Sequence, residues 1–262
     1  YIYGRGCSNG KRVQCFGGAK NHMIIMPDAD LDLAADALVG AGYGAAGERC
    51  MAISVAVPVG EATANALVDK LIPRVEKLKV GLSTDREADY GPLVTKQAMD
   101  RVVGYIDQGI KEGATLKVDG RGFKMQGYEN GYFLGGTLFD NVTKDMKIYK
   151  EEIFGPVLSV VRAKTYDEGL KLVNDHEYGN GTAIFTRDGD AARDEREPSS
   201  QSYPSLLKPH LHQRAVHHLH SYPGPFQTTH CVPKESLRAM DKAPVQLCLV
   251  GCRQEALDFS VH

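Results

Sequence analysis

The stretch Met23-Ile24-Ile25-Met26-Pro27-Asp28-Ala29-Asp30 decides the fold class, because a short apolar run passes directly into a helix start. A continuous apolar run of this length is typical of a strand buried on both faces. The acidic residues that follow complement the positive end of a helix dipole. Apolar residues then recur at helical spacing over 31–39. The stretch therefore predicts a buried strand followed by an amphipathic helix.

The same alternation continues on both sides of this stretch. Upstream, residues 1–16 predict a surface helix and a return strand at 12–16. Downstream, the expected strands are 53–57, 132–134, 157–161 and 182–185. The expected helices are 61–78, which Pro73 should kink or divide, 95–112 and 167–176. Strands that alternate with helices predict an α/β fold, an open and mostly parallel sheet with helices on both faces.

Bulk composition excludes several classes of function. The 262 residues carry a formal net charge of -2, with no long basic run, so nothing indicates a nucleic-acid partner. No apolar stretch approaches the roughly 18 to 20 residues of a membrane span. Six irregularly spaced cysteines indicate a reducing compartment rather than a disulfide framework. Cys248, Cys252 and His262 lack the spacing of a four-ligand zinc site, so we predict no metal.

The composition changes abruptly after Asp194. The last 68 residues contain 7 of the 9 histidines and 7 of the 12 prolines, but only 2 of the 28 glycines. We interpret 195–262 as a frameshifted or foreign tail without regular structure. The alternative is a metal-binding or interaction appendage, because His-rich tracts can bind metal. The break falls within an α/β unit rather than after a complete domain, which disfavours that alternative.

The stretch Gly47-Glu48-Arg49-Cys50 carries the strongest chemical signal. It lies between the small-residue segment 40–46, which ends the helix predicted to begin near residue 31, and the apolar run 52–57. A cysteine at such a corner can be reached by a substrate carbonyl, and a thiolate is a strong nucleophile near neutral pH. The alternative is that Cys50 is a small apolar core residue, as free cysteines commonly are.

Separated motifs make the nucleophile interpretation the stronger one. Gly17-Gly18-Ala19-Lys20-Asn21-His22, Gly47-Glu48-Arg49-Cys50 and Glu151-Glu152-Ile153-Phe154-Gly155-Pro156 occur in the order found in the aldehyde dehydrogenase superfamily, which this chain resembles. Their spacing, together with Tyr128-Glu129-Asn130-Gly131 and the 178–183 stretch, is similar to the CoA-acylating branch, the methylmalonate-semialdehyde dehydrogenases. The resemblance covers about residues 1–194.

The resemblance implies a domain division. Residues 1–18 would be the end of an NAD-binding domain and its seam, 19–194 part of the catalytic domain, and 195–262 a segment without a counterpart. In this family the Gly-rich loop and lysine that bind the rest of NAD lie upstream of Tyr1. The chain is therefore expected to be an inactive or unstable piece of a longer enzyme. The family forms homo-oligomers, tetramers or dimers, in the cytoplasm or, in eukaryotes, the mitochondrial matrix.

The resemblance also implies a mechanism and its residues. Cys50 would attack the aldehyde carbon of a malonate-type semialdehyde, NAD would take the hydride, and CoA as co-substrate would accept the acyl group from the resulting thioester. The N–H of Cys50 would stabilise the oxyanion. Glu152 and Phe154 would hold the nicotinamide ribose and ring, with Gly17 beside the cofactor. Arg49 could hold the substrate carboxylate through paired hydrogen bonds.

Several alternatives remain open at this point. Hydrolytic family members have a glutamate two residues before the Gly-Gly pair, where this chain has Cys15, a poor base for activating water. A hydrolytic aldehyde dehydrogenase, a thiol acyltransferase without NAD and a non-catalytic partner of an intact homologue are the other candidate functions. Glu48 with Arg49 could also be a solvated ion pair of little effect. No catalytic role is assigned to the segment 20–22.

Overall fold

A seven-stranded sheet organises the chain, in a computed structural model that describes residues 1–13, 15, 17–188 and 246–250. The strands are β1 (Asn21–Ile25), β2 (Ile53–Pro58), β3 (Thr115–Val118), β4 (Thr137–Asp140), β5 (Val157–Val160), β6 (Thr182–Thr186) and β7 (Gln246–Val250). Their order across the sheet is β3-β4-β5-β2-β1-β6-β7. The five central strands pair in parallel, and only the two edge strands, β3 and β7, run antiparallel to their neighbours. The predicted open, mostly parallel sheet is confirmed.

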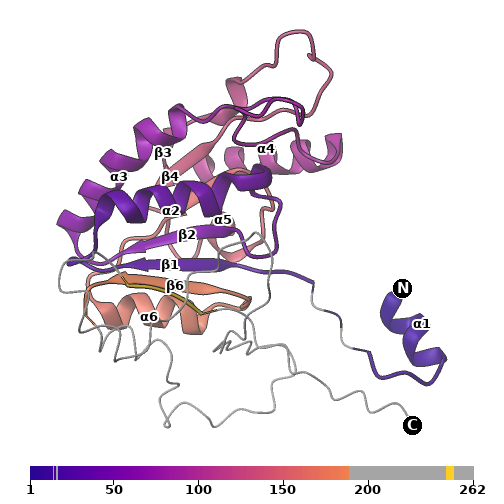
Figure 1. Ribbon diagram of the computed structural model, residues 1–262. Coiled ribbons are helices and arrows are strands. Elements are labelled where there is room, and N and C mark those ends of the chain that lie inside the picture. The colour runs from indigo at the N-terminus through magenta and orange to yellow at the C-terminus, as the bar shows by residue number, and fades with distance from the viewer. Residues whose placement is uncertain (14, 16, 189–245, 251–262) are drawn as a thin grey trace.

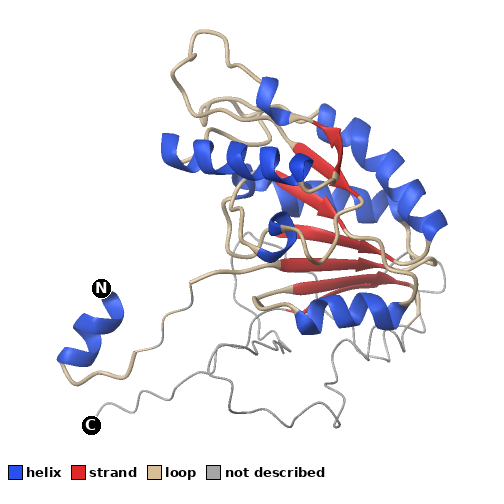
Figure 2. Ribbon diagram, turned by 180° about the vertical axis from the view of Figure 1, so that it is seen from behind, coloured by secondary structure: helices blue, strands red, loops and turns tan. Residues whose placement is uncertain are grey.

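Helices cover both faces of this sheet. The α-helices are α1 (Ile2–Ser8), α2 (Leu31–Tyr43), α3 (Glu61–Glu76), α4 (Lys96–Lys111), α5 (Lys147–Lys150) and α6 (Tyr166–Asp175). The two opposite views show α2 and α3 on one face, with α4 and α6 on the other (Figures 1 and 2). α1 buries no residue and lies apart from the sheet in both views. The layers are those of an α/β domain with its core on both sides of one sheet.

Polar side chains fix where the main helices begin. Asp30 accepts hydrogen bonds from two backbone N–H groups of the first turn of α2. Thr95 and Thr165 cap α4 and α6 in the same way, each accepting from an N–H three residues on. Such caps satisfy donors that have no partner within the helix. The caps explain why the predicted helix starts fall within a residue or two of the observed ones.

The five central strands are buried except at Ser54 of β2 and Thr182 of β6, which are partly exposed. All five residues of β1 are buried, as are the four residues of β5. Ile24 of β1, Leu38 of α2 and Leu67 of α3 are fully enclosed in one hydrophobic core. Burial on both faces is the reason that these strands appear in the sequence as continuous apolar runs.

Three sequence-based expectations are wrong. Residues 132–134 do not form a strand, and the chain turns from this segment into β4 a few residues later. Residues 12, 13 and 15 are not in a strand either, so the predicted return strand at 12–16 is absent from its described residues. α3 is not divided at Pro73, which lies near its C-terminal end. Proline removes one backbone donor, but the helix continues past it to Glu76.

Most of the segment after Asp194 lies outside the described residues. The interpretation of 195–262 as a foreign tail is therefore not tested over most of its length. Gln246–Val250 is described as β7, and it pairs antiparallel with β6 over five residue pairs, from Thr182↔Val250 to Thr186↔Gln246. The expectation that the whole tail lacks regular structure does not hold for these five residues.

Candidate active site

A strained turn connects α2 to residues 48–52, the loop that carries Cys50 and is called the Cys50 loop below. After α2 the chain forms a short 3-10 turn over Gly44–Gly47, in which Ala45 and Ala46 have φ values of 53° and 56°. L-residues in this left-handed region cost roughly 1–2 kcal/mol each. Gly47 has a φ of 68°, and a Cβ there would lie 2.1 Å from the carbonyl oxygen of Gly155. Glycine is therefore required at 47, where the Cys50 loop touches the 151–156 loop.

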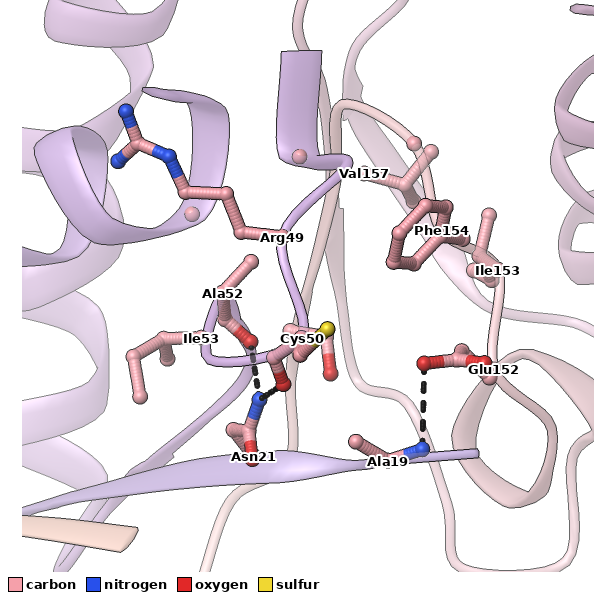
Figure 3. A pocket seen from close by; sticks show the side chains of 14 residues that line it. Ala19, Asn21, Arg49, Cys50, Ala52, Ile53, Glu152, Ile153, Phe154 and Val157 are labelled. Atoms are coloured by element: carbon pink, nitrogen blue, oxygen red, sulfur yellow. Dashed lines mark hydrogen bonds between the residues drawn. The ribbon is translucent and has the colours of Figure 1, made fainter. Parts of the chain in front are cut away.

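Cys50 lies exposed beside a hollow that these two loops form. The hollow has about 340 Å³ of empty volume, including space open to solvent. Its lining includes Ala19, Arg49, Cys50, Glu152, Phe154 and Gly155. The Cys50 sulfur faces the Glu152 side of the hollow (Figure 3). No described residue accepts the N–H of Cys50, so that donor is available to an oxyanion.

Glu152 is held at the opposite wall of the hollow. One of its carboxylate oxygens, Oε1, accepts the backbone N–H of Ala19 at 3.1 Å (Figure 3). The other oxygen has no partner among the described residues, which leaves it able to accept hydrogen bonds from a ligand. Phe154, two residues on, is partly buried and has a φ of 55°. The predicted pair is thus brought to the same hollow as Cys50.

Lys20 holds the 151–156 loop, called the Glu152 loop below, against the start of β1. Its Nζ donates to the carbonyl oxygens of Ile148 and Glu151, both at 2.8 Å. The side chain is 2% exposed, and burial lowers the pKa of Lys20 to about 7, although Glu152 and Glu151 oppose this shift. The two carbonyls lie at the end of the four-residue helix α5, where backbone acceptors lack helical partners. Lys20 supplies those partners from inside the protein.

Asn21 performs a similar function for the Cys50 loop. Its Nδ2 donates to the carbonyl oxygens of Cys50 and Ala52, both at 2.8 Å, and its Oδ1 accepts the N–H of Gly181 at 2.8 Å. The Nδ2 of Asn180 donates to the same Cys50 oxygen. Two amides, one at the start of β1 and one just before β6, therefore hold one carbonyl of the Cys50 loop.

His22 belongs to a buried aromatic cluster behind the site. Its ring makes edge contacts with Tyr149 and His176, and its Nδ1 and Nε2 lie 2.9 Å from the Lys20 carbonyl oxygen and 3.2 Å from the Tyr149 hydroxyl. Burial lowers the pKa of His22 to about 3, and the nearby His176 adds to the shift. His22 is thus a neutral structural histidine near pH 7, which agrees with leaving it out of the chemistry.

Glu48 and Arg49 do not form the ion pair that was one interpretation of the sequence. Glu48 accepts the N–H of Val94 at 3.2 Å, and partial burial raises the pKa of its carboxyl. Arg49 is exposed, and its guanidinium forms no hydrogen bond or ion pair with a described residue. Its side chain extends away from the Cys50 sulfur, toward Gly44 (Figure 3). Arg49 is the only cationic side chain that lines the hollow in the described part of the chain.

Gly17 and Cys15 lie outside the hollow. Both are exposed, and a Cβ on Gly17 would meet nothing within 4 Å. Nothing in this structure therefore requires glycine at 17. The described residues contain no group of three or more potential metal ligands, and the sequence-based zinc candidates at 248, 252 and 262 lie where no side chain is described.

The geometry places an exposed cysteine opposite a carboxylate and an aromatic side chain on an α/β sheet. The chain belongs to the aldehyde dehydrogenase family, whose model matches residues 1–198. It is 63% identical over 193 residues to the malonate-semialdehyde dehydrogenase of Pseudomonas aeruginosa, covering 74% of this chain and 39% of that protein. It is 52% identical to the human mitochondrial methylmalonate-semialdehyde/malonate-semialdehyde dehydrogenase [acylating], covering 74% and 36%.

Solved structures give the same family. A methylmalonate-semialdehyde dehydrogenase from Sinorhizobium meliloti complexed with NAD is 72% identical, with a TM-score of 0.72 over 74% of this chain and 40% of that one. The enzyme of the same name from Oceanimonas doudoroffii is 57% identical, with a TM-score of 0.71 and the same coverage. The chain thus spans about two fifths of the length of the relatives that it matches. Within the described part of the chain, no helix has both the length and the apolar character needed to cross a membrane.

Proposed function

We propose that this chain is part of a CoA-acylating semialdehyde dehydrogenase. The reaction would oxidise malonate or methylmalonate semialdehyde with NAD and pass the acyl group to CoA, giving acetyl-CoA or propanoyl-CoA with loss of the carboxylate as carbon dioxide. The observation that carries the proposal is the exposed Cys50 thiol, which shares one hollow with an unpaired Arg49 and a half-free Glu152 carboxylate.

Cys50, Glu152 and Phe154 each have a defined part in the proposed reaction. The Cys50 thiolate forms a bond to the aldehyde carbon, and the N–H of Cys50 donates to the oxygen on which negative charge develops. The free oxygen of Glu152 accepts from ribose hydroxyls, and Phe154 bounds the space for the nicotinamide. NAD, when bound, accepts the hydride that leaves the substrate carbon. The NAD bound in the structure of the Sinorhizobium meliloti relative supports this cofactor.

Transfer to CoA is favoured over transfer to water by the lining of the hollow. Among its described lining residues Glu152 is the only carboxylate, and it already accepts the Ala19 N–H. Cys15 stands where the resemblance gives hydrolytic enzymes their base, and it is exposed and outside the hollow. Water attack on a thioester needs a base within hydrogen-bond reach. A thiol such as CoA brings its own nucleophile.

Reverse acyl transfer tests the proposal without NAD. The chain is incubated with propanoyl-CoA, so that the Cys50 thiolate attacks the thioester carbonyl, the propanoyl group moves to Cys50 and the CoA thiolate leaves. Peptide mass spectrometry then measures propanoylation of each cysteine. Cys50 should react at least tenfold faster than Cys7 and Cys15, the other free and exposed cysteines among the described residues, and Cys50→Ser should abolish that signal alone. Equal labelling of all three would contradict the proposal.

A further inference from the structure

The carbonyl oxygen of Cys50 accepts two side-chain amides at once. Asn21 reaches it from β1, and Asn180 reaches it from the loop that precedes β6. A carbonyl oxygen has two lone pairs, so these two donors saturate it. The two residues are 159 positions apart in the sequence, and the parallel pairing of β1 with β6 brings them together.

Asn21 is a rigid anchor because both its amide nitrogen and its amide oxygen form hydrogen bonds with these loops. It is 2% exposed, both contacts of its Nδ2 are at 2.8 Å, and its Oδ1 holds the N–H of Gly181. The same side chain therefore ties the Cys50 loop and the 179–181 loop to the start of β1. Movement of either loop would leave a buried amide without partners, which is strongly unfavourable.

Asn180 adopts a costly backbone conformation to make its contact. Its φ is 121°, a region that side-chain-bearing residues rarely occupy, and it lies between Gly179 and Gly181. Such strain persists where the surroundings impose it, and it concentrates at functional sites. The bond to Cys50 is the only hydrogen bond found for the Asn180 side chain within the described structure.

We propose that Asn21 and Asn180 form a two-amide clamp, and that this clamp positions Cys50 for acyl transfer. Holding the carbonyl fixes the backbone torsion on one side of the Cys50 Cα. The thiol is then kept toward the Glu152 side of the hollow (Figure 3), and the free N–H of Cys50 keeps its place beside it. Both asparagines are positioning residues, since they act on Cys50 rather than on substrate. The proposal rests on the proposed role of Cys50 in acyl transfer.

The test compares two kinds of Cys50 reactivity in the complete chain. Propanoyl transfer from propanoyl-CoA needs an oriented thiol and an oxyanion donor, whereas alkylation by iodoacetamide needs an accessible thiolate. The variants are Asn180→Gly, Asn21→Ala and the double variant. Asn141→Gly is the matched control, because Asn141 also has a positive φ, 55°, and its amide donates to Thr115, far along the sequence from either asparagine.

The clamp predicts a split between the two reactions. In Asn180→Gly, propanoyl transfer at Cys50 should fall at least fivefold, while alkylation, measured against Cys7 in the same molecules, should stay within twofold. Amide exchange over residues 48–52 should quicken at least tenfold, with β2 and β5 unchanged. The double variant should lose less than the product of the two single losses, since both amides hold one atom. Asn141→Gly should change none of these quantities.

Other results would overturn the clamp. Unchanged exchange over 48–52, or a parallel fall of transfer and alkylation, would show that the amides do not orient Cys50. If the unmodified chain transfers no propanoyl group, the proposed function of Cys50 fails instead. Exchange over 48–52 in Asn180→Gly and Asn141→Gly then decides alone whether the clamp holds the loop.

Discussion

Replacing Lys20 by methionine should remove a pH dependence of stability that this buried amine creates. Lys20 is 2% exposed, and its folded-state pKa of about 7 lies well below the ordinary value of 10.5. Between these two values the unfolded chain binds a proton at this site that the folded chain does not. The free energy of unfolding therefore rises with pH from about 7 to 10.5, and the ionisation penalty is present in full below pH 7.

The size of the effect follows from this difference in proton binding. Each pH unit in the window adds about 1.4 kcal/mol, so pH 7 to pH 9 should add about 2–3 kcal/mol through Lys20. Methionine has a similar length but no donor, so the carbonyls of Ile148 and Glu151 lose their partner. At pH 9 the variant should be less stable by about 2–4 kcal/mol, since an unsatisfied buried acceptor costs about 1–3 kcal/mol. At pH 7 the difference in free energy of unfolding between the two chains should be smaller, because the ionisation penalty of Lys20 lowers the stability of the unmodified chain there.

Urea unfolding at several pH values between 6.5 and 9.5 measures both effects. Other groups that titrate in this range are shared by the two chains, so the difference between their slopes isolates Lys20. Lys79→Met is the control, because the Lys79 side chain is 65% exposed and should leave the slope of the unmodified chain unchanged. Equal slopes for the unmodified chain and Lys20→Met would refute the argument, since Lys20 would then keep its proton when folded.

Substitutions at four further positions test the loops around Cys50. Arg49→Leu should lower the ratio of iodoacetate to iodoacetamide alkylation at Cys50 about three- to fivefold, as expected for a solvent-exposed charge contact of about 1 kcal/mol. Arg49→Lys keeps the positive charge and should keep most of this ratio. An unchanged ratio in Arg49→Leu would show that Arg49 does not bind a carboxylate beside Cys50. Ala45→Gly should raise the free energy of unfolding by about 0.5 kcal/mol by relieving positive-φ strain at an exposed position. Ala46→Gly should leave the free energy of unfolding unchanged, because it also removes a buried methyl worth about 0.8 kcal/mol. Equal denaturation midpoints for Ala45→Gly and Ala46→Gly would count against the strain argument. Gly47→Ala should destabilise by at least about 2 kcal/mol in the same assay, since its Cβ would meet the Gly155 backbone.

The buried centre of the sheet could be predicted from the sequence because it depends on local pattern. The continuous apolar runs at 23–26 and 157–161 correspond to β1 and β5, within two residues at each end. The edge strand β3 could not be predicted in this way. Its residues alternate between exposed and partly buried over only four positions, a pattern that surface loops also show. The strand predicted at 132–134 is absent although its sequence has the apolar, aromatic character of a strand. Such a run can also pack on the core as an extended loop.

The chemical residues were easier to predict than the residues that hold them. Cys50, Glu152 and Phe154 carry their own signal, as a nucleophile motif and an acidic-aromatic motif, and the structure places all three at one hollow. Asn21 and Asn180 had no such signal. Their importance comes from long-range hydrogen bonds to the Cys50 carbonyl, which depend on the pairing of β1 with β6. A single sequence does not contain that distance information.

Backbone strain and supporting hydrogen bonds occur together around Cys50. Five non-glycine residues with positive φ are found in the described part of the chain, and four of them, Ala45, Ala46, Phe154 and Asn180, belong to the loops that meet at Cys50. At roughly 1–2 kcal/mol each, these conformations would relax if the surrounding structure allowed it. Buried Lys20 and Asn21 oppose that relaxation from adjacent positions, one holding the Glu152 loop and the other the Cys50 loop. The start of β1 is therefore the element on which the arrangement of both walls of the site depends, although it contributes no reacting group.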